Sequence, residues 1–238
     1  MIRGLAVFLT HVVLFPILGT WALLGHKLRP QSDHLMKTGA VWARCIMWVG
    51  GTRLKIKNPG IPDANRPAVI VANHTSNMEV FALMATLAAP ARYAAKAALF
   101  KLPFLGRCLD AAGTVPIPVS LSRAELPHIE RLGKALEESA LVIYFPEGER
   151  NPAGELGAFK LGAFATAIAY QVPIIPLAIH GGFAIDPRGS HRIRAGTLTL
   201  EYLDPIPTTG LDQNDRRTLR DKARATIEAA LSRAQHDR

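Results

Sequence analysis

A histidine and a glutamate five residues apart are the first residues whose types and spacing could do chemistry. His74 follows a short apolar run that ends at Ala72, and Glu79 follows Asn77, a residue type that caps helix starts. On a continuous helix, side chains five residues apart point about 140° away from each other, so this pair meets only if His74 lies in the turn before the helix. A histidine at a strand end with a carboxylate behind it suits general-base catalysis. Taken alone, such a pair is more often a structural hydrogen bond.

Other kinds of site are not indicated around this pair or at the cysteines. Ser76 lacks the G-x-S-x-G surroundings of a serine nucleophile, and no second histidine stands at zinc spacing from His74. Cys45 and Cys108 form no metal-binding spacing and no disulfide framework. We therefore expect no metal site and two reduced thiols, with a single disulfide left open.

The second chemical group is the run from Phe145 to Arg150, which reads F-P-E-G-E-R. It follows an apolar run, and open α/β sheets bind ligands at the carboxyl ends of their strands. Gly148 permits a close approach of the backbone, and Arg150 offers a planar fork that matches phosphate. The alternative is an ordinary turn with a surface ion pair.

Strand-like and helical patterns alternate after residue 51 and would position these groups. Strands are predicted over 52–57, 68–72, 141–145, 174–179 and 197–202. Helices are predicted over 78–88, 123–139, 160–170 and 212–234, the last capped by Asp212 or Asn214. The alternation predicts one α/β domain over 52–238, with a central, mostly parallel sheet flanked by helices.

The N-terminal segment is apolar enough for a membrane. Gly4 to Gly25 contains no charged residue and matches the ~20 residues that a spanning helix needs. A spanning helix and a helix lying in one leaflet both remain open, since Pro16 would kink a helix. A cleaved signal peptide is disfavoured because the run is long and no small-residue cleavage site follows it.

A second apolar stretch runs from Val41 to Val49, and the polar residues 30–34 separate it from the first. Trp42, Cys45 and Val49 recur at helical spacing. We expect a membrane-associated helical hairpin over residues 1–51, ended by two glycines. The alternative is that the second helix only packs on the α/β domain.

Composition narrows the class of partner. The 238-residue chain has a net charge of +9, a pI near 9.9 and 49% hydrophobic residues. Basic proteins attract nucleic acid, anionic membranes or anionic substrates. The basic residues form no Lys/Arg tract and no aromatic-rich nucleic-acid pattern. We therefore expect membrane lipids, and not nucleic acid, as the partner.

Taken together, the groups form an ordered set of four blocks. The blocks are 73–79 (N-H-T-S-N-M-E), Lys96 with 101–106 (K-L-P-F-L-G) and 113–117 (G-T-V-P-I), 145–150 (F-P-E-G-E-R) with 159–163, and 172–176 (V-P-I-I-P). In this order they resemble the glycerolipid acyltransferase family, typified by bacterial 1-acyl-glycerol-3-phosphate acyltransferase, whose first and third blocks read N-H-x-x-x-x-D and F-P-E-G-T-R.

The resemblance implies a reaction. His74 would deprotonate the hydroxyl of a lysolipid acceptor, and Glu79 would orient His74. The alkoxide would attack the thioester of acyl-CoA or acyl-carrier protein directly, with no acyl-enzyme and no cofactor. The favoured acceptor is 1-acyl-glycerol-3-phosphate, which gives phosphatidic acid in phospholipid biosynthesis. The implied location is the inner (cytoplasmic) membrane, with the catalytic domain on its cytoplasmic face.

The resemblance also implies an acceptor site. Arg150, helped by Lys96 or Lys160, would hold the anionic head group. Glu147 and Gly148 would shape that pocket.

Three departures leave the acceptor open. Glu79 stands where the family has Asp, Glu149 stands where it has Thr, and no Arg follows Ile117 until Arg123. A site with one cation fewer and one anion more binds phosphate less well. One alternative is a different lysolipid acceptor, such as a lyso-ornithine lipid. Two further alternatives concern the function itself: an inactive membrane-bound lipid-binding homologue, or a soluble hydrolase of acyl thioesters.

Overall fold

The computed structural model describes residues 2–29, 33–60, 62, 66–87, 91–117, 126–137, 141–190 and 192–236. Its strands are β1 (Thr52–Lys57), β2 (Ala68–Ala72), β3 (Ala91–Lys96), β4 (Val115–Ile117), β5 (Leu141–Tyr144), β6 (Ile174–His180) and β7 (Gly196–Tyr202). Its helices are α1 (Ile2–Leu28), α2 (His34–Gly50), α3 (Met78–Thr86), the 3-10 helix η1 (Ala97–Lys101), α4 (Pro103–Ala111), α5 (Leu126–Glu137), α6 (Gly162–Ala169), α7 (Gly182–Ile185) and α8 (Arg216–His236).

The described strands form one sheet in the order β1-β7-β6-β2-β5-β3-β4. Every neighbouring pair is parallel except β6 and β7, which run antiparallel. The central strand β2 is buried along its whole length, as expected for a parallel strand covered on both faces. The predicted α/β fold with a mostly parallel sheet is confirmed.

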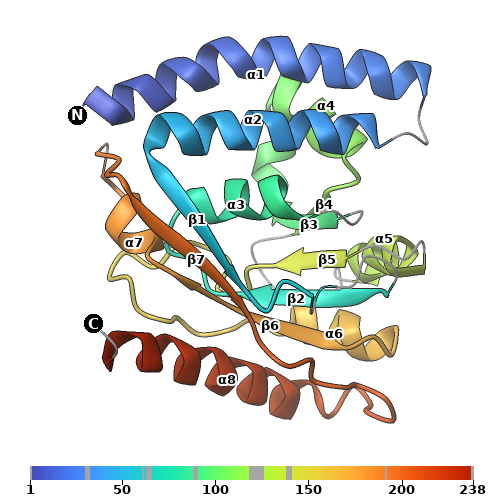
Figure 1. The fold of residues 1–238 in the computed structure, drawn as a ribbon. Coiled ribbons are helices and arrows are strands. Elements are labelled where there is room, and N and C mark those ends of the chain that lie inside the picture. Colours follow the sequence, from blue (N-terminus) through green and yellow to red (C-terminus); the bar gives the residue numbers. More distant parts are fainter. Residues whose placement is uncertain are drawn as a thin grey trace.

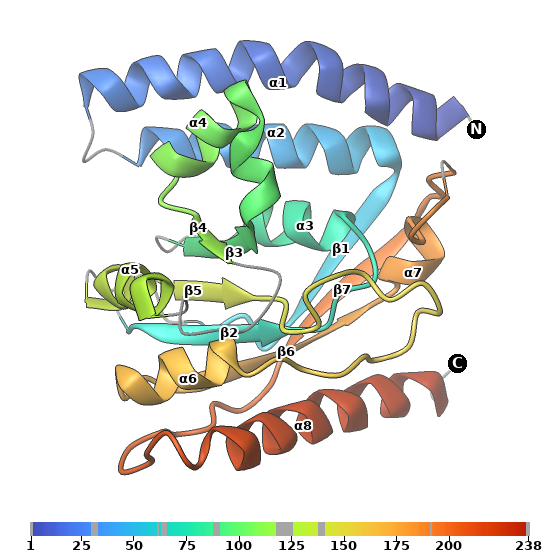
Figure 2. The ribbon, with the colours of Figure 1, turned by 180° about the vertical axis from the view of Figure 1, so that it is seen from behind.

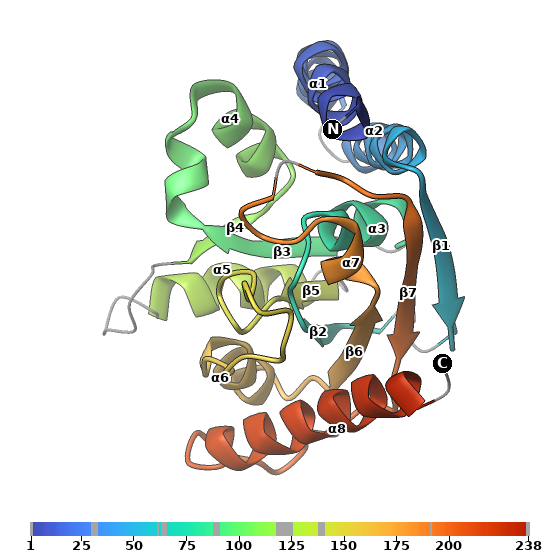
Figure 3. The same ribbon diagram turned by 90° about the vertical axis from the view of Figure 1, so that its left-hand side faces the viewer.

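Helices cover both faces of the sheet (Figure 1). Because strand side chains alternate between faces, Val69 and Val71 of β2 pack in one core cluster with residues of α5, α6 and α8. Ile70 and Ala72 point the other way, into a cluster with residues of α2, α3 and α7. Viewed from the side, α8 and α1 mark the two outer limits of the molecule (Figure 3).

The N-terminal helices form a hairpin in which α1 lies along α2, farthest from the sheet (Figures 1 and 2). The α1 helix is continuous across Pro16, and by length and composition it could cross a membrane. It exposes a broad apolar face, formed by Leu5, Phe8, Leu9, Val12, Val13, Ile17, Trp21 and Leu24. The α2 helix ends at Gly50 and is capped by Gly51, whose φ of +69° is the left-handed conformation that glycine favours.

The α2 helix also packs on the α/β unit. It contacts α3, and its residues Ala43 and Ile46 are fully buried in the same core cluster as β2. Trp48 on the other side of α2 is 83% exposed. The hairpin is therefore continuous with the core, and the division of the chain at residue 51 stays a prediction.

Several elements differ from the sequence-based prediction. The strands β3 and β4 and the helices η1, α4 and α7 were not predicted, and β5 ends at Tyr144, one residue early. The last helix begins at Arg216, so neither Asp212 nor Asn214 caps it. Those residues form the preceding turn, where the backbone N–H of Asp212 donates to the Asp215 carboxylate at 2.9 Å.

Candidate active site

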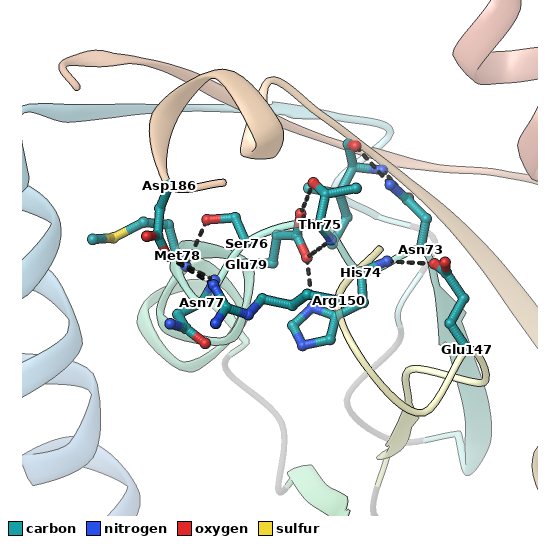
Figure 4. Close-up of polar contacts among 11 residues, drawn as sticks. Asn73, His74, Thr75, Ser76, Asn77, Met78, Glu79, Glu147, Arg150 and Asp186 are labelled. Carbon is teal, nitrogen blue, oxygen red and sulfur yellow. Dashed lines mark hydrogen bonds and ion pairs between the residues drawn. The ribbon is translucent and has the colours of Figure 1, made fainter. Parts of the chain in front are cut away.

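His74 lies in the turn between β2 and α3, as the sequence predicted. Its Nδ1 atom is 2.7 Å from Oε2 of Glu79 in the first turn of α3 (Figure 4). Asn77 occupies the N-cap position, but the hydrogen bond to the helix start comes from Ser76, whose Oγ accepts the N–H of Met78 at 3.0 Å. The turn lets two residues five apart point toward each other, which a continuous helix forbids.

The Glu79 carboxylate is fully buried and is surrounded by hydrogen-bond donors. Its two oxygens accept the backbone N–H of Thr75 at 3.1 and 3.0 Å, and Oε1 also accepts the Thr75 hydroxyl at 2.7 Å. A Cβ on Gly182 would collide with Oε1, so α7 packs directly against the carboxylate. A buried carboxylate held by several donors has one orientation, and it fixes the plane and tautomer of the His74 ring.

Neighbouring strands hold the backbone on each side of His74. The Asn73 amide exchanges two hydrogen bonds with the backbone of Ile179 on β6, at 3.0 and 2.7 Å. The His74 ring stacks on Phe145, with ring centroids 4.2 Å apart. The histidine is thus placed by β2, β5 and β6 together.

Glu147 accepts hydrogen bonds from the backbone at and near His74. Its Oε1 accepts the backbone N–H of His74 at 2.7 Å (Figure 4). Its Oε2 accepts the backbone N–H of Gly157 at 2.9 Å. Burial raises the pKa of the Glu147 carboxyl, and the two N–H donors act against that rise. Glu147 also lines the cavity that contains His74, so it connects the histidine turn to that cavity.

Gly148 and the two predicted lysines lie at the same edge of the sheet. Gly148 has a φ of +79°, and a Cβ there would lie 2.6 Å from Nζ of Lys160. Lys96 ends β3 and is exposed. Both lysines line the cavity that contains His74.

This cavity has a volume of about 1380 Å³ and two chemically distinct parts. One part is polar and is lined by His74, Lys96, Glu149, Arg150, Lys160 and Arg188. The other is apolar and is lined by residues of α1, α2, α3 and α4, among them Phe15, Trp42, Phe81 and Leu109. The arrangement suits a molecule with an anionic end and a long apolar end.

Two residues that sequence reasoning missed complete the polar part. Asp186 Oδ2 lies 3.5 Å from a guanidinium nitrogen of Arg150, and Arg188 Nη2 lies 2.9 Å from Oε2 of Glu149. Both follow β6, and ligands are expected at the carboxyl ends of strands. That rule, applied to the run after Ile179, is the signal that could have found them.

Some predicted features cannot be placed. The residues 118–123 follow Ile117 and include Arg123, the first arginine after it, and they lie outside the described residues. Within the described ranges, no group of three or more His, Cys, Asp or Glu side chains could hold a metal ion. Cys45 and Cys108 are both free thiols.

A comparison with known protein families shows which family this chain belongs to. The acyltransferase family matches residues 53–180, more than half of the chain. The chain belongs to the acyltransferase family. The match includes every predicted site residue from His74 to Lys160 and stops before Asp186 and Arg188.

The chain is also similar in sequence to individual acyltransferases. The chain is 33% identical over 188 residues to the chloroplastic 1-acyl-sn-glycerol-3-phosphate acyltransferase LPAT1 of Arabidopsis thaliana, covering 77% of this chain and 51% of that protein. It is 31% identical over 175 residues to 1-acyl-sn-glycerol-3-phosphate acyltransferase beta of Homo sapiens, covering 73% and 63%. The chain therefore spans about half to two thirds of the length of these relatives.

A solved structure of the family has the same fold. It is the 1-acyl-sn-glycerophosphate acyltransferase PlsC of Thermotoga maritima, which superposes with a TM-score of 0.80 at 21% identity over 96% of this chain and 95% of that one. The coverage extends beyond the matched family region, so the fold likeness includes elements at both ends of the chain.

Proposed function

We propose that the protein transfers a fatty acyl chain from an acyl thioester to the hydroxyl of a lysolipid. The observation that carries this proposal is the His74–Glu79 pair, 2.7 Å apart, facing a cavity with a cationic part and a long apolar part. The favoured acceptor is 1-acyl-glycerol-3-phosphate, the substrate in the names of the relatives, and the product is then phosphatidic acid.

The geometry supports a direct transfer. With Nδ1 of His74 donating to Glu79, Nε2 is the nitrogen that accepts the proton of the acceptor hydroxyl. The resulting alkoxide oxygen attacks the thioester carbonyl, the carbon–sulfur bond breaks, and the thiolate leaving group takes the proton back from His74. Glu79 stays ionised and stabilises the imidazolium between these two steps.

The two parts of the cavity have separate tasks in this proposal. Arg150, Lys96 and Lys160 bind the head group, since all three border the polar part. The apolar part holds an acyl chain between the α1–α2 hairpin and helices α3 and α4. Aromatic rings line it closely, with Phe15 and Phe81 at 4.9 and 5.2 Å from the ring of Trp42.

The apolar face of α1 supports membrane association. The opposite side of the same helix lines the cavity with Val7, Phe15 and Leu18, so α1 lies between the proposed membrane surface and the acyl-chain site. We place the protein at the inner (cytoplasmic) membrane with the α/β unit on the cytoplasmic face, where acyl-CoA and acyl-carrier protein are found.

A zwitterionic acceptor, such as a lyso-ornithine lipid, is the second candidate. The observation that favours it is the Glu149 carboxylate at the polar part of the cavity, where it would repel a second negative charge and attract an ammonium group.

The test is a mass-spectrometric assay of the purified protein in detergent with acyl-CoA or acyl-carrier protein and a panel of lysolipids. Transfer to lysophosphatidic acid supports the favoured acceptor, and transfer to a zwitterionic lysolipid alone supports the second candidate. Thioester loss without any acceptor identifies a hydrolase instead. Neither transfer nor hydrolysis means that the protein is a lipid-binding homologue without activity.

A further inference from the structure

The segment Gly181–Arg188 reaches both sides of the candidate site. It follows β6 and contains α7, and it lies beyond the family match. Gly182 packs against Glu79, Asp186 faces Arg150, and Arg188 contacts Glu149. Three successive contacts from one short segment place it over the catalytic carboxylate and the head-group cations together.

Arg150 is held by a buried partner. The Asp186 side chain is only 9% exposed, and its Oδ2 accepts the backbone N–H of Asn77 at 3.2 Å besides facing Arg150 at 3.5 Å (Figure 4). Because Asp186 is anchored to the start of α3, it fixes the guanidinium of Arg150 in place. Arg150 is therefore a cation positioned by a buried carboxylate.

Arg188 is held by an exposed partner. The Arg188 and Glu149 side chains are 40% and 57% exposed, with 2.9 Å between Nη2 and Oε2. Nη1 of Arg188 also donates to the carbonyl oxygen of Arg150 at 3.0 Å, which keeps the guanidinium at the cavity. An exposed ion pair contributes little net stability, so an incoming anion can replace the carboxylate at low cost.

Glu149 lies where cations converge. Arg188 first, and then Lys96 and Lys160, lower the pKa of the Glu149 carboxyl below its ordinary value. All four side chains line the same cavity. The carboxylate therefore occupies a position where three cations attract negative charge, and a phosphate group would experience the same attraction there.

We propose that Arg188 is a further head-group cation of this site, and that Glu149 holds the anion position until the phosphate of an acceptor displaces it. The proposal rests on the proposed function and deepens it. It makes an anionic phosphate head the preferred acceptor, because Arg188 supplies a planar cation where Glu149 adds a negative charge. After displacement, Glu149 borders the bound head group and limits the negative charge that the site accepts.

The experiment measures two quantities with each variant. The first is the Kd of lysophosphatidic acid in detergent without an acyl donor, and the second is the acceptor KM and kcat with the donor present. The variants are Arg188→Ala, Arg188→Lys and Glu149→Gln. The control is Arg192→Ala, which removes an exposed arginine from the same loop that is not among the described residues lining the cavity. Monoacylglycerol, which lacks the phosphate, is the matched acceptor.

The Arg188→Ala and Glu149→Gln variants should change the Kd of lysophosphatidic acid in opposite directions. Arg188→Ala should raise the Kd and KM of lysophosphatidic acid about tenfold, the effect of one lost charge-assisted hydrogen bond, with kcat little changed. Arg188→Lys should restore only part of this, because Lys lacks the planar fork. Glu149→Gln should lower the Kd by about threefold, as expected for removing one screened surface charge. Monoacylglycerol and Arg192→Ala should show neither change.

A merely structural ion pair gives a different pattern. In that case Arg188→Ala and Glu149→Gln break the same contact and shift Kd in the same direction, and this result overturns the proposal. An unchanged Kd in a folded Arg188→Ala or Arg188→Lys variant overturns it as well. The donor-free Kd separates the two hypotheses, because wild-type binding without turnover contradicts the proposed function while the effect of Arg188 is still measured.

Discussion

The Nδ1 atom of His74 lies 2.7 Å from Oε2 of Glu79, and the same carboxylate also accepts the backbone N–H and the hydroxyl of Thr75. The Thr75 contacts leave Glu79 no other orientation, so the position of the histidine ring follows from the position of Thr75. The turn that joins β2 to α3 therefore orients the His74 ring.

Glu79→Gln should reduce kcat more than Glu79→Asp does. A Gln amide would turn its NH₂ group toward His74 or toward the N–H of Thr75, both of which donate to the carboxylate, and it cannot stabilise the imidazolium. We expect a loss of about 10³–10⁴-fold for Gln. Asp keeps the charge but retreats by about one C–C bond, ~1.5 Å. Steady-state kinetics of both variants, with circular dichroism as the fold control, measure the ranking, and the reverse order contradicts it.

Glu147→Gln should damage both stability and activity. Glu147 accepts N–H groups from His74 and Gly157 with separate oxygens, and Gln has one oxygen for the two donors. One N–H is then left without an acceptor, at a cost of about 1–3 kcal/mol in the free energy of unfolding. The decrease in kcat follows because the His74 backbone loses its anchor.

The matched control is Glu155→Gln, an exposed carboxylate in the same loop. Thermal unfolding and kcat should stay at wild-type values there. If Glu147→Gln behaves like this control, the two hydrogen bonds do not position His74.

The pairing of His74 with Glu79 could be predicted because it depends on residues close in sequence. The order N-H-T-S-N-M-E contains a strand end, a turn and a helix start, and these elements decide which side chains meet. The contacts of Glu149 and Arg150 could not be predicted. They join residues 36–39 positions away on another loop, and that loop is brought there by tertiary contacts such as the packing of α7 against Glu79 and the hydrogen bond from Asn77 to Asp186.

The missed strands have a physical explanation too. The strand β3 reads A-R-Y-A-A-K, in which three alanines mask any alternation of apolar and polar residues. The strand β4 has three residues with Pro116 in the middle, a residue type that argues against a strand except at a sheet edge. β4 is indeed at the edge.

Charges on the exposed face of α1 should weaken membrane binding. Val13→Lys with Ile17→Lys places two charges on residues that are 55% and 59% exposed and pack little within the protein. Flotation with phospholipid vesicles should show at least about tenfold weaker binding, given the cost of lysine in an apolar membrane layer. Deleting residues 1–51 is a poorer test, because it also removes the buried Ala43 and Ile46 of α2.

Thr209→Lys with Thr218→Lys controls for charge. It adds the same two charges at exposed positions in the turn before α8 and on α8, across the molecule from α1 (Figure 1). This variant should float like the wild type. Equal flotation of the α1 variant and the control would contradict membrane binding through α1.

Neither cysteine should be needed for transfer. Partial burial raises the pKa of the Cys108 thiol, so less thiolate is present at neutral pH and alkylation should be slow there and accelerate as the pH rises. The double change Cys45→Ser with Cys108→Ser should keep most of the activity. A folded double variant without transfer would point to a covalent acyl-cysteine instead of direct attack.

The central claim is that His74 is the base for acyl transfer to a lysolipid. The most direct measurement is the rate of phosphatidic acid formation by purified wild type, His74→Ala and His74→Gln, from acyl-CoA or acyl-carrier protein and lysophosphatidic acid, followed by mass spectrometry. We predict product with the wild type and a loss of about 10²–10⁴-fold in both variants, with unchanged thermal unfolding. Wild-type rates in a folded His74 variant would contradict the account.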